Sequence, residues 1–266
     1  MKQFRIEAEK CSACQLCVIA CKDEHVGVAH SPWTAPQPET GQFWIAVHEA
    51  EHGRAPRLRT SRLPVMCQHC TNAACMKVCA PAAIRRRPDG LVWIDPASCT
   101  GCGLCEPACP YDAIAMNAAL GVAQKCTGCA HLVDEGLPPR CVEVCPHDVI
   151  VFGEDVAREA ETLHPEFLAR PLVGWTGLPR PSLAGCVIDA AAEMVVVDAW
   201  VTATDLFADH TTTARSDAFG AFRLDGLQNG RKYQVTIGTP DYRTVIRIVT
   251  LAAGDEDLGE VVLCPA

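Results

Sequence analysis

The chain has 266 residues, enough for two domains, and 18 of these residues are cysteine. Its formal net charge of −9 at pH 7 argues against general binding of nucleic acid. The first ten residues lack the apolar region of a signal peptide, and no run approaches the roughly 18 apolar residues of a membrane span. We therefore expect a soluble, cytoplasmic protein, unless a partner that carries an export signal takes the chain with it.

Sixteen of the cysteines lie between Cys11 and Cys145 in four sets, which form an internal repeat. Every set begins with C-x2-C and ends with C-x3-C, and the gap before the third cysteine varies. Such tight, repeated spacing is typical of metal ligation and not of a disulfide framework. The four sets are Cys11, Cys14, Cys17 and Cys21; Cys67, Cys70, Cys75 and Cys79; Cys99, Cys102, Cys105 and Cys109; and Cys126, Cys129, Cys141 and Cys145.

The segments between and after the sets differ in character. Residues 22–66 are rich in proline, histidine and arginine, lack periodicity, and are expected to wrap the surface. Residues 83–95, "AIRRRPDGLVWID", indicate a strand, a turn and a second strand. Residues 153–182 combine a charged, helix-compatible run with a stretch rich in proline and glycine, which predicts a linker with a short helix.

Residues 183–266 contain about seven short runs rich in β-branched residues, separated by turn residues. This rhythm predicts a small β-sandwich without a ligand cluster. The expected fold class is α+β. Tandem bacterial-ferredoxin-like modules with inserts occupy residues 1–152, and the all-β domain follows the linker.

The third set, "CTGCGLCEPACP", indicates how the cysteine ligands of one set are divided between two clusters. In bacterial two-cluster ferredoxins, the last cysteine of C-x2-C-x2-C-x3-C-P binds the neighbouring cluster. Cys109 lies one helical turn beyond Cys105, and Pro110 ends that turn because it has no N–H group. The sets must therefore exchange ligands in pairs. The pairs can be adjacent, one with two and three with four, or nested, one with four and two with three; spacing leaves both open.

Zinc knuckles are the alternative for C-x2-C units. The recurring C-x3-C and the Cys-Pro ends at Pro110 and Pro146 favour iron–sulfur clusters, because zinc requires neither feature.

The four sets resemble the iron–sulfur subunits of the dimethyl sulfoxide reductase family of molybdopterin oxidoreductases, including the long insert "KCTGCAHLVDEGLPPRCVEVC" in set four. Cys102 is intact, which disfavours the nitrate-reductase branch, where one cysteine of set three is a tryptophan. The resemblance implies nested pairing and four 4Fe–4S clusters. Their ligands would be Cys11, Cys14, Cys17 and Cys145; Cys126, Cys129, Cys141 and Cys21; Cys67, Cys70, Cys75 and Cys109; and Cys99, Cys102, Cys105 and Cys79.

The C-terminal stretch "TARSDAFGAFRLDGLQNGRKYQVTI" is similar to the transthyretin-like domain of the small subunits of pyrogallol–phloroglucinol transhydroxylase and resorcinol hydroxylase. In the transhydroxylase type set three is degraded, whereas here it is complete. This difference favours a net redox reaction, such as hydroxylation of resorcinol with water during anaerobic aromatic degradation. A transhydroxylase, a reductive catechol dehydroxylase and a free-standing polyferredoxin remain as alternatives.

The resemblance also implies the partners. The expected partner is a large catalytic subunit that holds molybdenum bis-pterin guanine dinucleotide, in a heterodimer or higher oligomer, together with a soluble electron carrier. This chain shows no catalytic constellation of its own, so we expect an electron-transfer subunit without catalytic residues.

The remaining candidates have modest expected roles. Cys186 and Cys264 are expected to be buried free thiols, with a disulfide as the alternative. The histidines within or beside the sets are expected to form hydrogen bonds around the clusters. Three consecutive arginines are expected on a solvated strand face, or else against the partner, and three tryptophans in the core or an interface. These residues are His69, His131 and His147; Arg85, Arg86 and Arg87; and Trp33, Trp44 and Trp93.

Overall fold

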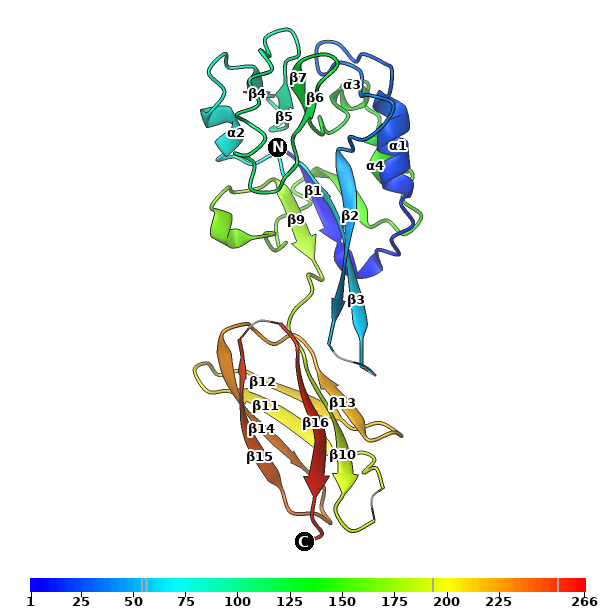
Figure 1. The fold of residues 1–266 in the computed structure, drawn as a ribbon, viewed down its shortest axis with the longest axis vertical. Helices are drawn as coiled ribbons and strands as arrows, with labels where there is room; N and C mark the ends of the chain where they lie inside the picture. The colour runs from blue at the N-terminus through cyan, green and yellow to red at the C-terminus, as the bar shows by residue number, and fades with distance from the viewer. Residues whose placement is uncertain (54, 56, 193, 253) are drawn as a thin grey trace. The chain divides into compact units, whose positions relative to one another are not determined.

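The structure is a computed structural model that describes residues 1–53, 55, 57–192, 194–252 and 254–266. Its contacts divide the chain into two compact units. Unit 1 comprises Met1–Glu49 and Arg62–Leu178, and unit 2 comprises Ala50–Ser61 and Pro179–Ala266. Figure 1 labels most of the elements of both units. No helix in the described part of the chain is long and apolar enough to cross a bilayer.

A three-stranded sheet organises the core of unit 1. Strand β1 (Lys2–Glu7) is central, with β8 (Ile150–Glu154) antiparallel on one side and β9 (Val173–Thr176) parallel on the other. Trp175 on β9 is fully buried. The structure thus differs from the linker expected over residues 153–182, because β9 is part of the core sheet. The charged run there forms turns and a 3-10 helix, η2 (Pro165–Phe167), and no α-helix.

Short helices and hairpins make up the rest of unit 1. Two antiparallel hairpins pair β4 with β5 and β6 with β7, and the first of them is the strand–turn–strand expected over residues 83–95. The elements are η1 (Ala8–Lys10), α1 (Leu16–His25), α2 (Ala74–Lys77), β4 (Ile84–Arg86), β5 (Val92–Ile94), β6 (Ala115–Asn117), β7 (Val122–Gln124), α3 (Ala130–Asp134) and α4 (Arg140–Glu143).

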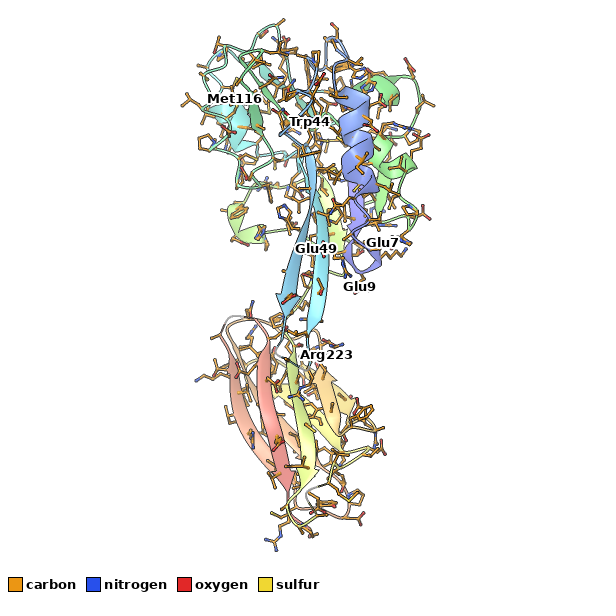
Figure 2. The ribbon with its side chains drawn as sticks, turned by 45° about the vertical axis from the view of Figure 1, so that its right-hand side comes forward. Glu7, Glu9, Trp44, Glu49, Met116 and Arg223 are labelled. Atoms are coloured by element: carbon orange, nitrogen blue, oxygen red, sulfur yellow. The ribbon has the colours of Figure 1, made fainter. Side chains whose placement is uncertain are left out.

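The segment between the first two cysteine sets contains a strand pair that its sequence did not predict. Strands β2 (Ile45–His52) and β3 (Arg59–Met66) form a two-stranded sheet. Most of their side chains are at least partly exposed, so no alternation of apolar and polar residues marks them. Trp44, just before β2, is buried within unit 1 (Figure 2).

Unit 2 contains the β-sandwich expected from residues 183–266. One sheet has the order β13-β10-β16, and the other has the order β12-β11-β14-β15. Leu183, Val201, Tyr233 and other buried residues from both sheets form its core. The seven strands are β10 (Leu183–Asp189), β11 (Trp200–Asp205), β12 (Thr211–Arg215), β13 (Ala221–Leu224), β14 (Arg231–Gly238), β15 (Val245–Leu251) and β16 (Glu256–Leu263).

Residues 50–61, the tip of the β2–β3 hairpin, also belong to unit 2 and are held there by ion pairs. Arg57 contacts both carboxylate oxygens of Asp257, at 2.8 and 3.0 Å. Arg59 donates to Asp255 at 2.9 Å, and Asp255 also accepts from the backbone N–H of Ser182 at 2.6 Å. The Asp255 side chain is only 5% exposed, so its charge depends on these donors.

We expect Asp255→Asn to destabilise unit 2 at pH 7 by about 1–3 kcal/mol, because it removes charge-assisted hydrogen bonds from a buried group. Burial acts to raise the pKa of the Asp255 carboxyl, but hydrogen bonds from Arg59 and Ser182 outweigh burial and hold that pKa below its ordinary value. The stabilisation is therefore complete above the ordinary aspartate pKa and is lost as the pH falls through the folded-state value.

Thermal unfolding of the variant and the parent at a series of pH values measures this effect. The matched control is Asp225→Asn, which removes an exposed partner of Arg223 and should change little. Equal effects of the two substitutions would contradict the prediction.

Candidate functional site

The fold brings the sixteen cysteines together in four groups, each drawn from two different sets. Three of the groups each line a separate cavity. In the fourth group, burial raises the pKa of the Cys70 thiol, and so do the charges of Cys67, Cys75 and Cys109, which places these four cysteines close together. The grouping in space is the nested one, sets one with four and two with three. The members are group A, Cys11, Cys14, Cys17 and Cys145; group B, Cys21, Cys126, Cys129 and Cys141; group C, Cys67, Cys70, Cys75 and Cys109; and group D, Cys79, Cys99, Cys102 and Cys105.

The helical C-x3-C spacing produces this exchange between sets. Cys17 and Cys21 lie one turn apart on α1, where the first belongs to group A and the second to group B. In set four the order is reversed. Cys141 on α4 belongs to group B, and Cys145, just beyond that helix, belongs to group A. One turn of helix therefore separates group A from group B.

The C-x2-C loops share a backbone conformation that turns N–H groups toward sulfur. The second spacer residue has a positive φ in all four loops, at Ala13, His69, Gly101 and Gly128. Two loop amides donate to cysteine sulfurs, His69 N to Cys67 Sγ at 3.4 Å and Gly128 N to Cys126 Sγ at 3.3 Å. Such N–H···S bonds stabilise negative charge on sulfur, as the thiolates of an iron–sulfur cluster require.

Gly101 and Gly103, in the loop of group D, allow a matched test of this geometry. Both have a positive φ, +68° and +74°. A Cβ added at Gly101 would lie 2.2 Å from the carbonyl oxygen of Gly121, whereas a Cβ at Gly103 would meet no atom within 4 Å. Gly103→Ala should cost only the left-handed strain of about 1–2 kcal/mol. Gly101→Ala should cost more and distort the loop.

We therefore expect Gly101→Ala, but not Gly103→Ala, to lower the iron content of the protein after purification without oxygen. Equal iron content in the two variants would contradict the close approach of the two loops.

Burial raises the pKa of thiols in every group: Cys17 to about 11, Cys129 to about 12, Cys70 to about 12 and Cys105 to about 11. Negative charge on the neighbouring thiols acts in the same direction. Four ionised thiols around one small cavity therefore require cations to neutralise them. This donor set fits an iron–sulfur cluster, which would supply one-electron redox chemistry when bound.

Comparison of the chain with known proteins shows the family to which it belongs. The 4Fe-4S dicluster domain family matches residues 58–155, and the carboxypeptidase regulatory-like domain family matches residues 182–263. The pyrogallol hydroxytransferase small subunit of Pelobacter acidigallici is 30% identical, over 97% of both chains. An anaerobic dimethyl sulfoxide reductase chain of Escherichia coli is 35% identical, over 56% of this chain and 72% of the relative. This chain belongs to the iron–sulfur subunits of the dimethyl sulfoxide reductase family of molybdopterin oxidoreductases.

Membership confirms the predicted resemblance and favours iron–sulfur over zinc. It also confirms the combination of a ferredoxin-like 4Fe–4S domain with an all-β domain of the regulatory, transthyretin-like type. A tetrathionate reductase subunit of Salmonella typhimurium, a further relative, is 34% identical over 56% of each chain. The assignment of the sixteen individual cysteines as ligands stays a prediction.

Histidines surround group B of the iron–sulfur subunit. Buried His25 lies with its Nε2 atom 3.9 Å from Cys129 Sγ, and it follows Cys17 and Cys21 at the same four-residue spacing on α1. His25 was not predicted from the sequence, although the spacing could have identified it. His69 approaches Cys126 Sγ at 3.8 Å, in keeping with the hydrogen-bonding role expected of it. His147 lines the cavity of group A.

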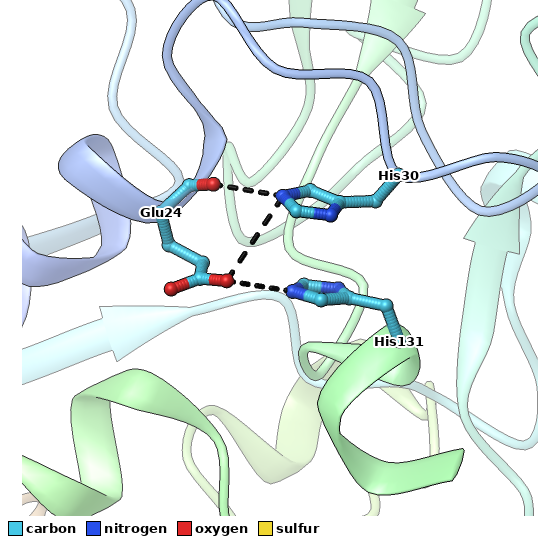
Figure 3. A group of neighbouring side chains, drawn as sticks. All are labelled: Glu24, His30 and His131. Carbon is cyan, nitrogen blue, oxygen red and sulfur yellow. Dashed lines mark hydrogen bonds and ion pairs between the residues drawn. The ribbon is translucent and has the colours of Figure 1, made fainter. Parts of the chain in front are cut away.

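Glu24, His30 and His131 form a cluster of neighbouring side chains (Figure 3). Both imidazole rings of this cluster pack edge-on against His25, with ring centroids 5.2 and 5.3 Å away. His131 Nε2 donates to the Glu24 carboxylate at 2.9 Å, and His30 Nε2 donates to the Glu24 carbonyl oxygen at 2.8 Å. The two imidazole rings stack with centroids 3.7 Å apart, so their nitrogen lone pairs do not converge on one point. This arrangement suits a hydrogen-bonded support for α1 and α3 better than a further metal site.

The expectation of a solvated arginine face is wrong for two of the three arginines. Arg87 is buried, pairs with Asp89 at 2.9 Å and with Asp134, and lies 4.1 Å from the Trp33 ring. Arg86 donates to the carbonyl oxygens of His69 and Cys70, in the loop of group C. Arg85 is half exposed and pairs with Asp95 at 3.4 Å.

Cys186 and Cys264 are free thiols, as expected, but neither is fully buried: Cys186 is partly buried and Cys264 is exposed. Cys186 Sγ lies 3.4 Å from the carbonyl oxygen of Phe219. Trp44 and Trp93 are buried, and Trp33 packs edge-on against Trp93 with ring centroids 4.8 Å apart.

Proposed function

We propose that this iron–sulfur subunit carries four 4Fe–4S clusters in groups A to D and relays single electrons along them. The observation that carries the proposal is the nested convergence of sixteen cysteines into four compact groups of four. Each group offers four thiols and loop amides, the donor set that such a cluster needs. Groups A and B are joined by the helical turns of α1 and α4, which favours electron transfer between these two groups.

We further propose a partner subunit with molybdenum bis-pterin guanine dinucleotide, a soluble electron carrier, and a cytoplasmic location. The 30% identity to a pyrogallol hydroxytransferase small subunit over 97% of the chain supports a phenolic substrate for that partner. The completeness of set three supports net redox chemistry. Hydroxylation of resorcinol with water would release two electrons and two protons for each hydroxyl group formed.

Purification of the tagged chain from its native host, without oxygen, tests the subunit assignment. We expect a brown protein with about 16 iron atoms per chain, four for each of four clusters. We also expect a large subunit that contains molybdenum. Recovery of the chain without a molybdenum-containing partner would favour a free-standing polyferredoxin, and a colourless zinc protein would end the iron–sulfur proposal.

The redox response of the purified complex distinguishes the reactions. Addition of resorcinol to oxidised complex, with no acceptor present, should bleach the visible absorbance of the clusters, since hydroxylation with water delivers electrons to them. A reductive catechol dehydroxylase would instead oxidise prereduced clusters when catechol is added. A transhydroxylase would leave the redox state unchanged, because its reaction has no net electron change.

A further inference from the structure

A buried lysine lies beside two of the cysteine groups. Lys125 is 2% exposed, and its ammonium donates to the carbonyl oxygens of Val92 and, at 2.9 Å, Cys126. Within the described parts of the chain, no carboxylate lies at ion-pair distance from it. An ammonium in a dry interior requires negative charge nearby, and backbone carbonyls supply only partial charges.

The thiols of groups B and C are the available negative groups. Lys125 is adjacent in sequence to Cys126 of group B. Its charge also acts on Cys75 and Cys109, both of group C, where it opposes the rise in pKa that burial causes. One cation is therefore shared between two groups that come from different nested pairs.

His69 joins the same two groups by hydrogen bonds. Its backbone N–H donates to Cys67 Sγ of group C at 3.4 Å, and its Nε2 lies 3.8 Å from Cys126 Sγ of group B. The Val92 N–H donates to Nδ1 at 3.0 Å, which leaves the ring proton on Nε2, directed at sulfur. Val92 also accepts from Lys125, so the lysine, the histidine and both sulfurs form one connected network.

We propose that Lys125 and His69 form the electron-transfer junction between the two nested pairs, and that they raise the reduction potentials of the clusters in groups B and C. The inference rests on the proposed function, because it requires those clusters. Reduction adds one negative charge to a cluster, so a buried cation and N–H···S bonds favour the reduced form.

Redox titration followed by paramagnetic resonance tests the proposal on the intact complex. Lys125→Met removes the charge and keeps most of the side-chain volume, and it should shift two of the four potentials to more negative values. Lys125→Arg retains the charge and should preserve the parent potentials. Lys232→Met, on an exposed position of β14, makes the same charge change in unit 2 and should leave all four potentials unchanged.

His69→Leu is a second, independent variant. It removes the side-chain N–H but keeps the backbone donor to Cys67, so it should lower the potential of the group B cluster most. It should also weaken the magnetic coupling between the two reduced clusters. His69→Gln, which restores an N–H donor, should recover part of the shift.

The outcomes separate this inference from the proposed function. A parent protein without about 16 iron atoms per chain would refute the four-cluster proposal itself. Variants that retain the parent iron content but show unchanged potentials would refute only the junction, as would a shift in Lys125→Arg as large as in Lys125→Met. If Lys125→Met loses iron, the test depends on His69→Leu: an unchanged potential of the group B cluster in that variant would refute the junction.

Discussion

Cys109→Ala is expected to remove the same cluster as Cys67→Ala, although the two cysteines are 42 positions apart and belong to different sets. The reason is the nested convergence in group C, where burial raises the pKa of Cys70, and Cys67, Cys75 and Cys109 are close enough for their charges to raise it further. Each variant should lose about four iron atoms per chain. The same paramagnetic resonance signal should disappear from the reduced protein in both, and electron relay through the subunit should stop.

Two controls make this test specific. Cys105→Ala, four residues from Cys109 in the same set, should remove the signal of group D instead. Cys186→Ala removes a free thiol outside the sets and should leave iron and spectra unchanged. If Cys109→Ala removed the signal that Cys126→Ala removes, the ligands would pair between adjacent sets, and the nested assignment would be wrong.

Trp175→Ala should have the largest effect on the stability of unit 1. The indole is fully buried on β9, opposite Ile6 of β1, and its Nε1 donates to Gln68 Oε1 at 3.2 Å. Gln68 is one of the two spacer residues of set two, between Cys67 and Cys70. Replacement of a buried tryptophan by alanine typically costs about 3–5 kcal/mol, because it leaves a large cavity.

The variant should therefore lose cluster absorbance at a lower denaturant concentration than the parent, and the group C signal should decay first during exposure to a chelator. Trp175→Phe keeps most of the aromatic packing and loses only the hydrogen bond to Gln68, so its midpoint should lie close to that of the parent. If Trp175→Ala matched the parent in midpoint and iron release, the packing of Trp175 would not stabilise unit 1, and the prediction would be wrong.

The redox chemistry was readable from the sequence because it depends on local spacing. C-x2-C units need only a tight loop, and C-x3-C needs only one turn of helix, so both patterns can be recognised without knowledge of the fold. The seven strands of unit 2 were likewise predictable, since their β-branched runs alternate with turn residues.

Other features depended on contacts between distant residues. The β2–β3 hairpin lacks a clear apolar alternation, and the ion pairs of its tip with Asp255 and Asp257 join positions about 200 residues apart. Strand β9 lies in a segment rich in proline and glycine, and it becomes a strand because β1 offers it a parallel partner. Arg86 and Arg87 do not lie on the expected solvated face. Arg86 donates to the carbonyl oxygen of Cys70, and Arg87 pairs with the carboxylate of Asp134, both in other segments of the chain.

Residue types and short-range spacing were enough to predict four four-cysteine sets, an iron–sulfur chemistry and a β-domain, because those properties are local. The choice between adjacent and nested grouping required the folded chain, and so did the position of Lys125 and His69 between groups B and C. Spacing says that a cysteine must reach a neighbouring group. Which group is its neighbour depends on how the chain segments pack, and that packing is a property of the whole fold.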